Sequence, residues 1–115
     1  MGNVGDPLVG GTMVEQVVPG AELVVRGRLD VGSVGVVRDA LQHAVDSGTG
    51  DLLVHLHAVD LTDAAGLGVL LGAHRRARLA ERRLVLVGVP PRLERLIRHT
   101  RLHRVLVRSQ AAVSA

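Results

Sequence analysis

The chain has 115 residues, a length typical of one domain, and 47% of them are hydrophobic while 22% are charged. This apolar content is well above that of disordered chains, so we expect one compact core. Because Phe, Trp and Tyr are absent, the core must be built from Val, Leu and Ala, and base-stacking platforms for nucleic acids are excluded. The absence of cysteine excludes disulfides, thiolate metal sites and thiol nucleophiles.

Nothing in the sequence predicts secretion or a membrane location. Residues 1–6 lack the basic cluster and following apolar run of a secretion signal. The longest apolar stretches are interrupted within about ten residues, far short of the roughly 20 that a spanning helix needs. We therefore expect a cytoplasmic protein without a membrane partner.

The net charge of +3 is unevenly distributed along the chain. Residues 74–108 hold eleven arginines against two glutamates, whereas residues 1–73 hold three arginines against nine acidic residues. A molecule with this asymmetry can be steered towards an acidic partner, or it can associate with itself head to tail.

Both ends of the chain lack hydrophobic periodicity. Residues 1–11 include five Gly or Pro residues, and we predict a flexible N-terminal tail there. Residues 110–115 are predicted to form a flexible C-terminal tail in the same way. The single domain is expected to occupy residues 12–109.

The first part of the domain is predicted to be a hairpin followed by a helix. Two runs rich in β-branched residues, 12–18 and 21–28, flank the turn dipeptide Pro19-Gly20. From Val34 the apolar residues recur every three or four positions, which predicts a helix that ends at Ser47-Gly48.

A strand is predicted over residues 51–59, with Val59 on the face opposite Leu56. Asp63 then provides an N-cap for a helix that runs to about Arg82. We expect this helix to bury Gly66, Val69, Leu70, Ala73, Ala77 and Ala80, and to expose Arg75, Arg78 and Arg82.

The remainder is predicted as an apolar strand at residues 84–87, a helix opened by Pro90-Pro91 and a short strand at residues 105–107. Each later strand follows a crossover helix, so the sheet must be largely parallel, with an antiparallel hairpin at its start. The predicted fold is a mixed α/β domain of order β-β-α-β-α-β-α-β, a small sheet packed by helices.

The start of the second helix is the segment best suited to a regulatory contact. Asp63 can accept hydrogen bonds from the free N–H groups of the first turn, where the helix dipole is positive. A hydroxyl in this turn would be exposed to a kinase, and a phosphate added there would be held by backbone donors. The two residues after Asp63 are Ala64 and Ala65, which carry no hydroxyl.

From about residue 14 to residue 107 the chain resembles the STAS family, the domain of bacterial anti-sigma factor antagonists. Residues 24–30 look like the family's turn that ends in Leu-Asp, with Arg28 where an acid is usual. Residues 55–70 look like the family's signature, which normally reads Asp-Ser-Ser-Gly-Leu and here reads Asp-Ala-Ala-Gly-Leu. Residues 91–100 fit its third helix.

The resemblance implies a STAS-like fold and a binding protein that is not an enzyme. It implies as partner a serine-kinase-type anti-sigma factor of ATPase fold, whose binding frees a sigma factor to activate transcription. In the family, the second residue after the Asp is the Ser that is phosphorylated to release the partner, and Ala65 occupies that position here. The expected contact residues are Asp30, Asp63, Ala64, Ala65, Gly66 and Leu67, with Leu67 as an apolar anchor.

Two consequences of the missing serine stay open. The chain is either a permanently competent antagonist or a STAS module regulated elsewhere. A further alternative is a scaffold or sensor subunit that assembles with other STAS chains or as a homodimer. Thr62 is the nearest hydroxyl and a weak candidate for a displaced phosphorylation site, although a residue before an N-cap is more often part of a loop.

Three other patterns favour structural explanations. The glycines at positions 66, 68 and 72 lie inside a helix, so close packing against the sheet is a better explanation than a nucleotide loop. His55 and His57 share a strand face, and Asp60 or Asp63 could add an oxygen ligand, but no third histidine is nearby, so we expect no metal site. The arginines of residues 75–83 fit a solvated helix face, and we predict no nucleic-acid partner, cofactor or catalytic site.

Overall fold

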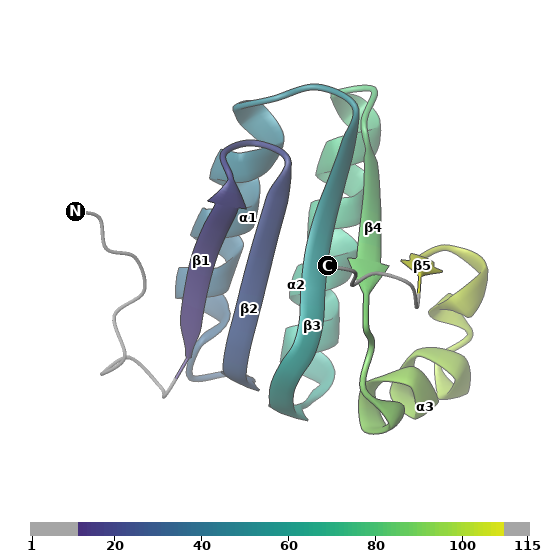
Figure 1. Ribbon diagram of the computed structural model, residues 1–115. Helices are drawn as coiled ribbons and strands as arrows, with labels where there is room; N and C mark the ends of the chain where they lie inside the picture. The colour runs from purple at the N-terminus through teal and green to yellow at the C-terminus, as the bar shows by residue number, and fades with distance from the viewer. Residues whose placement is uncertain (1–11, 110–115) are drawn as a thin grey trace.

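The computed structural model describes residues 12–109, so both predicted tails lie outside the described residues. Figure 1 shows a sheet with helices α1 and α2 side by side against one of its faces. The elements in chain order are β1 (Met13–Val18), β2 (Glu22–Leu29), α1 (Val34–Asp46), β3 (Asp51–Thr62), α2 (Ala64–Leu79), β4 (Arg83–Val87), α3 (Pro91–His99), the 3₁₀ helix η1 (Leu102–Arg104) and β5 (Val107–Ser109).

The predicted fold class is confirmed. The five strands are hydrogen-bonded in the order β1-β2-β3-β4-β5. β1 and β2 form an antiparallel hairpin, and every other pairing is parallel. The carboxyl ends of β2, β3 and β4 therefore lie at the same end of the sheet as the starts of α1, α2 and α3 (Figure 1).

The core is aliphatic, as the composition requires. It lies between the sheet and its helices, where apolar faces with strand and helix periodicity meet. The largest side chains that are fully buried are Leu23, Leu29, Leu41, Leu52, Leu56, Leu70, Leu84, Leu86, Leu93, Ile97, Val25 and Val37.

The structure corrects the predicted strand β3 in length and in alternation. β3 continues to Thr62, which pairs with Leu29, so the segment after Val59 is strand rather than loop. Between the pairs Val24–His55 and Arg26–Ala58, β3 advances by one residue more than β2. This bulge reverses the alternation, and Val59 joins the core instead of pointing away from it.

The ends of two other elements also differ from the prediction. Helix α2 stops at Leu79 and Glu81 adopts a left-handed conformation with φ of 60°, so helical periodicity no longer applies beyond it. Ala80, predicted buried, is exposed, whereas Arg82, predicted exposed, is only 4% exposed. The last strand is Val107–Ser109, because a 3₁₀ turn precedes it where the strand was expected to begin.

Arg82 is a buried cation that is neutralised by carbonyl oxygens rather than by a carboxylate. Its Nη1 donates to Ala44 O at 2.9 Å and to Val45 O at 3.0 Å, at the C-terminal end of α1, where the helix dipole is negative. Its other nitrogens reach the β1–β2 turn and the α1–β3 loop, through the carbonyls of Gly20, Thr49, Gly50 and Asp51. One side chain at the start of β4 thus connects to the β1–β2 turn and to residues 44–51, which are distant from it in the sequence.

Replacing Arg82 with Met is expected to lower the free energy of unfolding by about 3 kcal/mol or more, because several buried carbonyls lose a charged donor. Arg82→Lys should recover part of this loss, since an ammonium offers fewer donors than a guanidinium. The matched control is Arg83→Met, because Arg83 is exposed and pairs only with Asp51 at 2.8 Å. Urea unfolding of the variants measures the effect, and equal losses for Arg82→Met and Arg83→Met would contradict it.

Candidate functional site

Asp63 joins the start of α2 to the loop between β2 and α1. Its Oδ1 accepts a hydrogen bond from Gly66 N at 3.1 Å, which confirms the predicted N-cap. Its Oδ2 accepts from Val31 N at 3.3 Å, and its own N–H donates to Leu29 O at 3.3 Å. The two loops at this end of the sheet are therefore held together by one residue.

The β2–α1 loop is also fixed by its own hydrogen bonds. Asp30 Oδ1 accepts from Gly32 N at 3.0 Å, and Asp30 N donates to Ser33 Oγ at 3.1 Å. The fully buried Ser33 hydroxyl in turn donates to Arg28 O at 2.9 Å. The structure thus brings the loop that carries Asp30 to Asp63, although 33 positions separate the two aspartates in the sequence.

The predicted contact residues divide into exposed and buried members. Ala64 is exposed and Ala65 is half-buried, whereas Gly66 and Leu67 are buried. Leu67, expected to be an apolar anchor for a partner, is 4% exposed and belongs to the core, so that prediction is wrong. The reason is the helical period, which turns residue 67 towards the sheet while residues 64 and 65 face outwards.

Val31 is an exposed apolar residue of this surface that the sequence analysis missed. Its side chain is 74% exposed, and its backbone is fixed by the hydrogen bond to Asp63. An apolar residue between an aspartate and a glycine in a short loop was the available signal. Val31, unlike Leu67, is therefore an exposed apolar side chain at this end of the sheet.

Thr62 lies next to a group of cations from α3. Its half-buried side chain lines a hollow together with Arg92, Arg95, Leu96 and His99. On the other side it borders Asp60 and the start of α3. A phosphate group on Thr62 would therefore lie in a hollow that Arg92, Arg95 and His99 also line.

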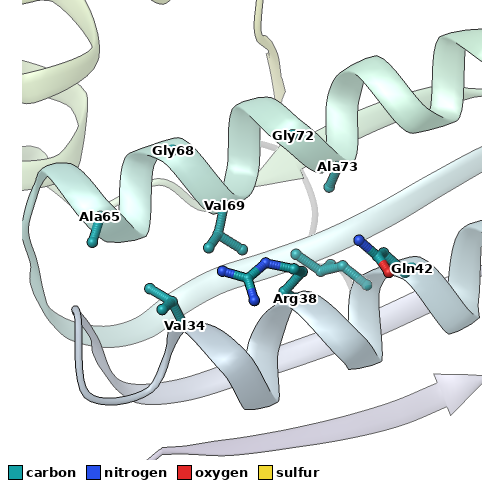
Figure 2. Close-up of a pocket in the computed structure, with 9 residues that line it drawn as sticks. Val34, Arg38, Gln42, Ala65, Gly68, Val69, Gly72 and Ala73 are labelled. Atoms are coloured by element: carbon teal, nitrogen blue, oxygen red, sulfur yellow. The ribbon is translucent and has the colours of Figure 1, made fainter.

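A groove of about 410 Å³ runs between α1 and α2 and begins at this same end (Figure 2). Towards the far end of the two helices, Arg76 of α2 forms an ion pair with Asp46 of α1, with 2.8 Å between Nη2 and Oδ2. The hydrogen bond from Arg76 holds the pKa of Asp46 below its ordinary value. The groove is lined by Val34, Arg38, Leu41, Gln42, Ala65, Gly68, Val69, Gly72 and Ala73.

The two strand histidines do not form a metal site with other residues. His55 is 9% exposed and its Nε2 lies 2.5 Å from Glu22 Oε2, while His57 is exposed. Within residues 12–109, no group of three or more His, Asp or Glu side chains is arranged to hold a metal ion. The buried His74 of α2 has a pKa below its ordinary value, chiefly because burial disfavours the charged ring.

Comparison with known proteins agrees with this geometry. The family model described as "Mlab, STAS domain" matches residues 13–108, which is most of the chain. This chain belongs to the STAS family. The match runs from the first residue of β1 into β5 and includes the N-capped start of α2. No helix of the part that the structure describes is long and apolar enough to cross a membrane.

This STAS domain is similar in sequence to proteins named anti-sigma-B factor antagonists. It is 33% identical to an anti-sigma-B factor antagonist of Staphylococcus aureus over 81 residues, 70% of this chain and 75% of the relative. An anti-sigma-B factor antagonist of Staphylococcus epidermidis is 33% identical over 75 residues, 65% of this chain and 69% of that protein.

The fold is shared with the anti-sigma factor antagonist SpoIIAA in its unphosphorylated form, with a TM-score of 0.66 at 20% identity over 88% of this chain and 89% of the other. A putative anti-sigma factor antagonist from Thermotoga maritima has a TM-score of 0.72 at 16% identity over 84% of both chains.

The glycines of α2 play different structural roles, and this difference can be tested. A Cβ on Gly66 would lie 2.3 Å from Leu29 O, whereas a Cβ on Gly68 would meet nothing within 4 Å. Gly66→Ala should therefore destabilise the domain by about 2 kcal/mol, because α2 must move away from β2. Gly68→Ala should stabilise it by up to about 1 kcal/mol through helix propensity. Thermal unfolding distinguishes them, and equal midpoints would refute the close approach of α2 to β2.

Proposed function

We propose that this STAS domain is an anti-sigma factor antagonist that binds a serine-kinase-type anti-sigma factor and so frees a sigma factor to activate transcription. The proposed contact surface consists of Asp30, Val31, Asp63, Ala64 and Ala65. The names of the similar staphylococcal proteins support the antagonist role. The partner is an ATPase-fold protein, and the proposed action is binding rather than catalysis.

The observation that carries the proposal is the capped start of α2. Asp63 fixes both the helix terminus and the neighbouring loop, so the surface is rigid before a partner arrives. Preorganised surfaces lose less conformational entropy on binding. Ala64 and Ala65 give this surface small side chains that permit close approach, while Val31 adds exposed apolar area.

The same two alanines determine how the domain is regulated under this proposal. Neither has an oxygen that can accept a phosphoryl group, so a partner kinase cannot modify the domain at the usual position. The domain is therefore a permanently competent antagonist. It would stay bound to the anti-sigma factor under conditions in which an antagonist with a phosphorylatable serine would be released.

A negative charge placed on this surface should reduce affinity. Ala64→Glu and Ala65→Glu are expected to weaken binding at least about tenfold, because they add bulk and charge where the partner packs. Both changes favour the helix electrostatically at its N-terminus, so the loss would not reflect unfolding. Calorimetry against each purified ATPase-fold anti-sigma factor of the source genome measures the affinity.

The control for this series is Leu79→Glu, which adds the same charge to a side chain that is 87% exposed at the other end of α2. Its affinity should equal that of the unmodified chain. Unchanged binding by both alanine variants would exclude this surface, and binding to none of the anti-sigma factors would refute the proposed function.

A kinase switch should be restorable by one hydroxyl. With the bound anti-sigma factor and ATP present, the unmodified chain should keep its mass and stay bound, whereas Ala64→Ser or Ala65→Ser should gain one phosphate and dissociate. Intact mass spectrometry with size-exclusion chromatography follows both. Phosphate on the unmodified chain, lost in Thr62→Val, would instead identify Thr62 as the site.

A second candidate function is assembly with other STAS chains or with a second copy. The separation of charge between residues 1–73 and 74–108 favours it, because head-to-tail contact would bring opposite charges together. Sedimentation at low and high salt tests this alternative, and a monomer at both would exclude self-association.

A further inference from the structure

Gly68 and Gly72 leave part of the α2 wall of the α1–α2 groove as bare backbone. A Cβ at either position would meet nothing within 4 Å, so the packing of this domain does not require glycine there. Close packing explains Gly66 alone. Glycine inside a helix is less favourable than alanine, so these two glycines lower the stability of α2, and no packing contact within the described domain requires them. Their effect is to let another backbone approach the helix.

Arg38 is a cation without a counter-ion at this groove. Its side chain extends from α1 across the groove towards α2, beside Val69 (Figure 2). It makes no hydrogen bond or ion pair within residues 12–109, whereas the neighbouring Arg76 is paired with Asp46. Gln42, one turn further along α1, adds an amide to the same lining. An occupant would therefore complement the groove best with a carboxylate.

The walls of the groove favour a protein segment over a small molecule. Val34 and Leu41 of α1 face Val69 and Ala73 of α2, so most of the lining is apolar. All lining residues belong to these two helices, so within residues 12–109 no third element lines the groove. A small ligand would keep much of its surface in water, whereas a segment of a docked protein would be covered by the rest of that protein.

The groove is continuous with the proposed contact surface. Ala65 belongs to both, and Val34 begins α1 directly after the loop that carries Asp30 and Val31. We propose that the α1–α2 groove binds a segment of the anti-sigma factor that presents an acidic side chain to Arg38 and apolar side chains to Val34 and Val69. This inference rests on the proposed function and specifies which kinds of side chain the anti-sigma factor places in the groove.

Filling the groove tests this proposal without disturbing the fold. Gly72→Met occupies open space and replaces a helical glycine, so its melting temperature should equal or exceed that of the unmodified chain. It should nevertheless weaken binding of the anti-sigma factor at least about tenfold, because the side chain blocks the groove. The matched control is Ala80→Met, which adds the same side chain at an exposed position outside the groove and should stay within about twofold.

The charge is tested separately. Arg38→Gln should weaken binding about tenfold and Arg38→Glu further, because the partner's carboxylate loses its cation and then meets a like charge. The exposed Arg78 of α2 lies outside the groove, so Arg78→Gln should leave affinity unchanged. In spectra of the ¹⁵N-labelled chain, addition of the anti-sigma factor should shift the amide signals of Gly68 and Gly72.

The outcomes separate the two proposals. If the unmodified chain binds and both Gly72→Met and Arg38→Gln bind equally well, the groove is not a contact and only the present inference fails. If the Ala64→Glu variant loses binding as well as the groove variants, both surfaces are contacts of one partner. If the unmodified chain binds no anti-sigma factor, the proposed function fails and the groove proposal fails with it.

Discussion

The buried guanidinium of Arg82 holds one end of this domain together. Its hydrogen-bond acceptors are backbone carbonyl oxygens at the end of α1, in the β1–β2 turn and just before β3. Such groups are costly to bury without donors, and a planar guanidinium with five N–H groups can serve several of them at once. The Asp51 carboxylate forms its hydrogen bonds with Arg83, and Asp51 offers Arg82 its backbone carbonyl. The layer of α1 and the sheet are thus joined electrostatically where the aliphatic core ends.

The opposite end of the sheet carries the proposed contact surface. There Asp63 and the close approach of Gly66 to Leu29 fix the start of α2 against β2. Residues 31 and 64 are exposed and residue 65 is half-buried, so parts of their side chains remain accessible at this end. From this end the groove extends between α1 and α2. The proposed contact surface and the groove are therefore continuous from the loop of Asp30 to Gly72.

The elements of the fold could be predicted because they follow local rules. Pro19-Gly20 marks the hairpin turn, apolar spacing from Val34 marks α1, and Asp63 marks the start of α2. Errors arose where a non-local contact overrides a local pattern. The bulge in β3 reverses the alternation at Val59, and Arg82 is buried because carbonyls from three other segments surround it. Leu67 was assigned to the surface although its helical phase directs it to the core.

The sequence by itself determined the family, the layered α/β topology, the capped start of α2 and the absence of a hydroxyl at positions 64 and 65. Hydrophobic period, capping and residue identity are properties of contiguous segments, and these suffice for such conclusions. Only the tertiary structure decided that the loop after Asp30 meets Asp63, that Val31 rather than Leu67 is exposed, and that Arg38 shares a groove with Gly68 and Gly72. Each of these depends on how separate elements pack against each other, which no single segment specifies.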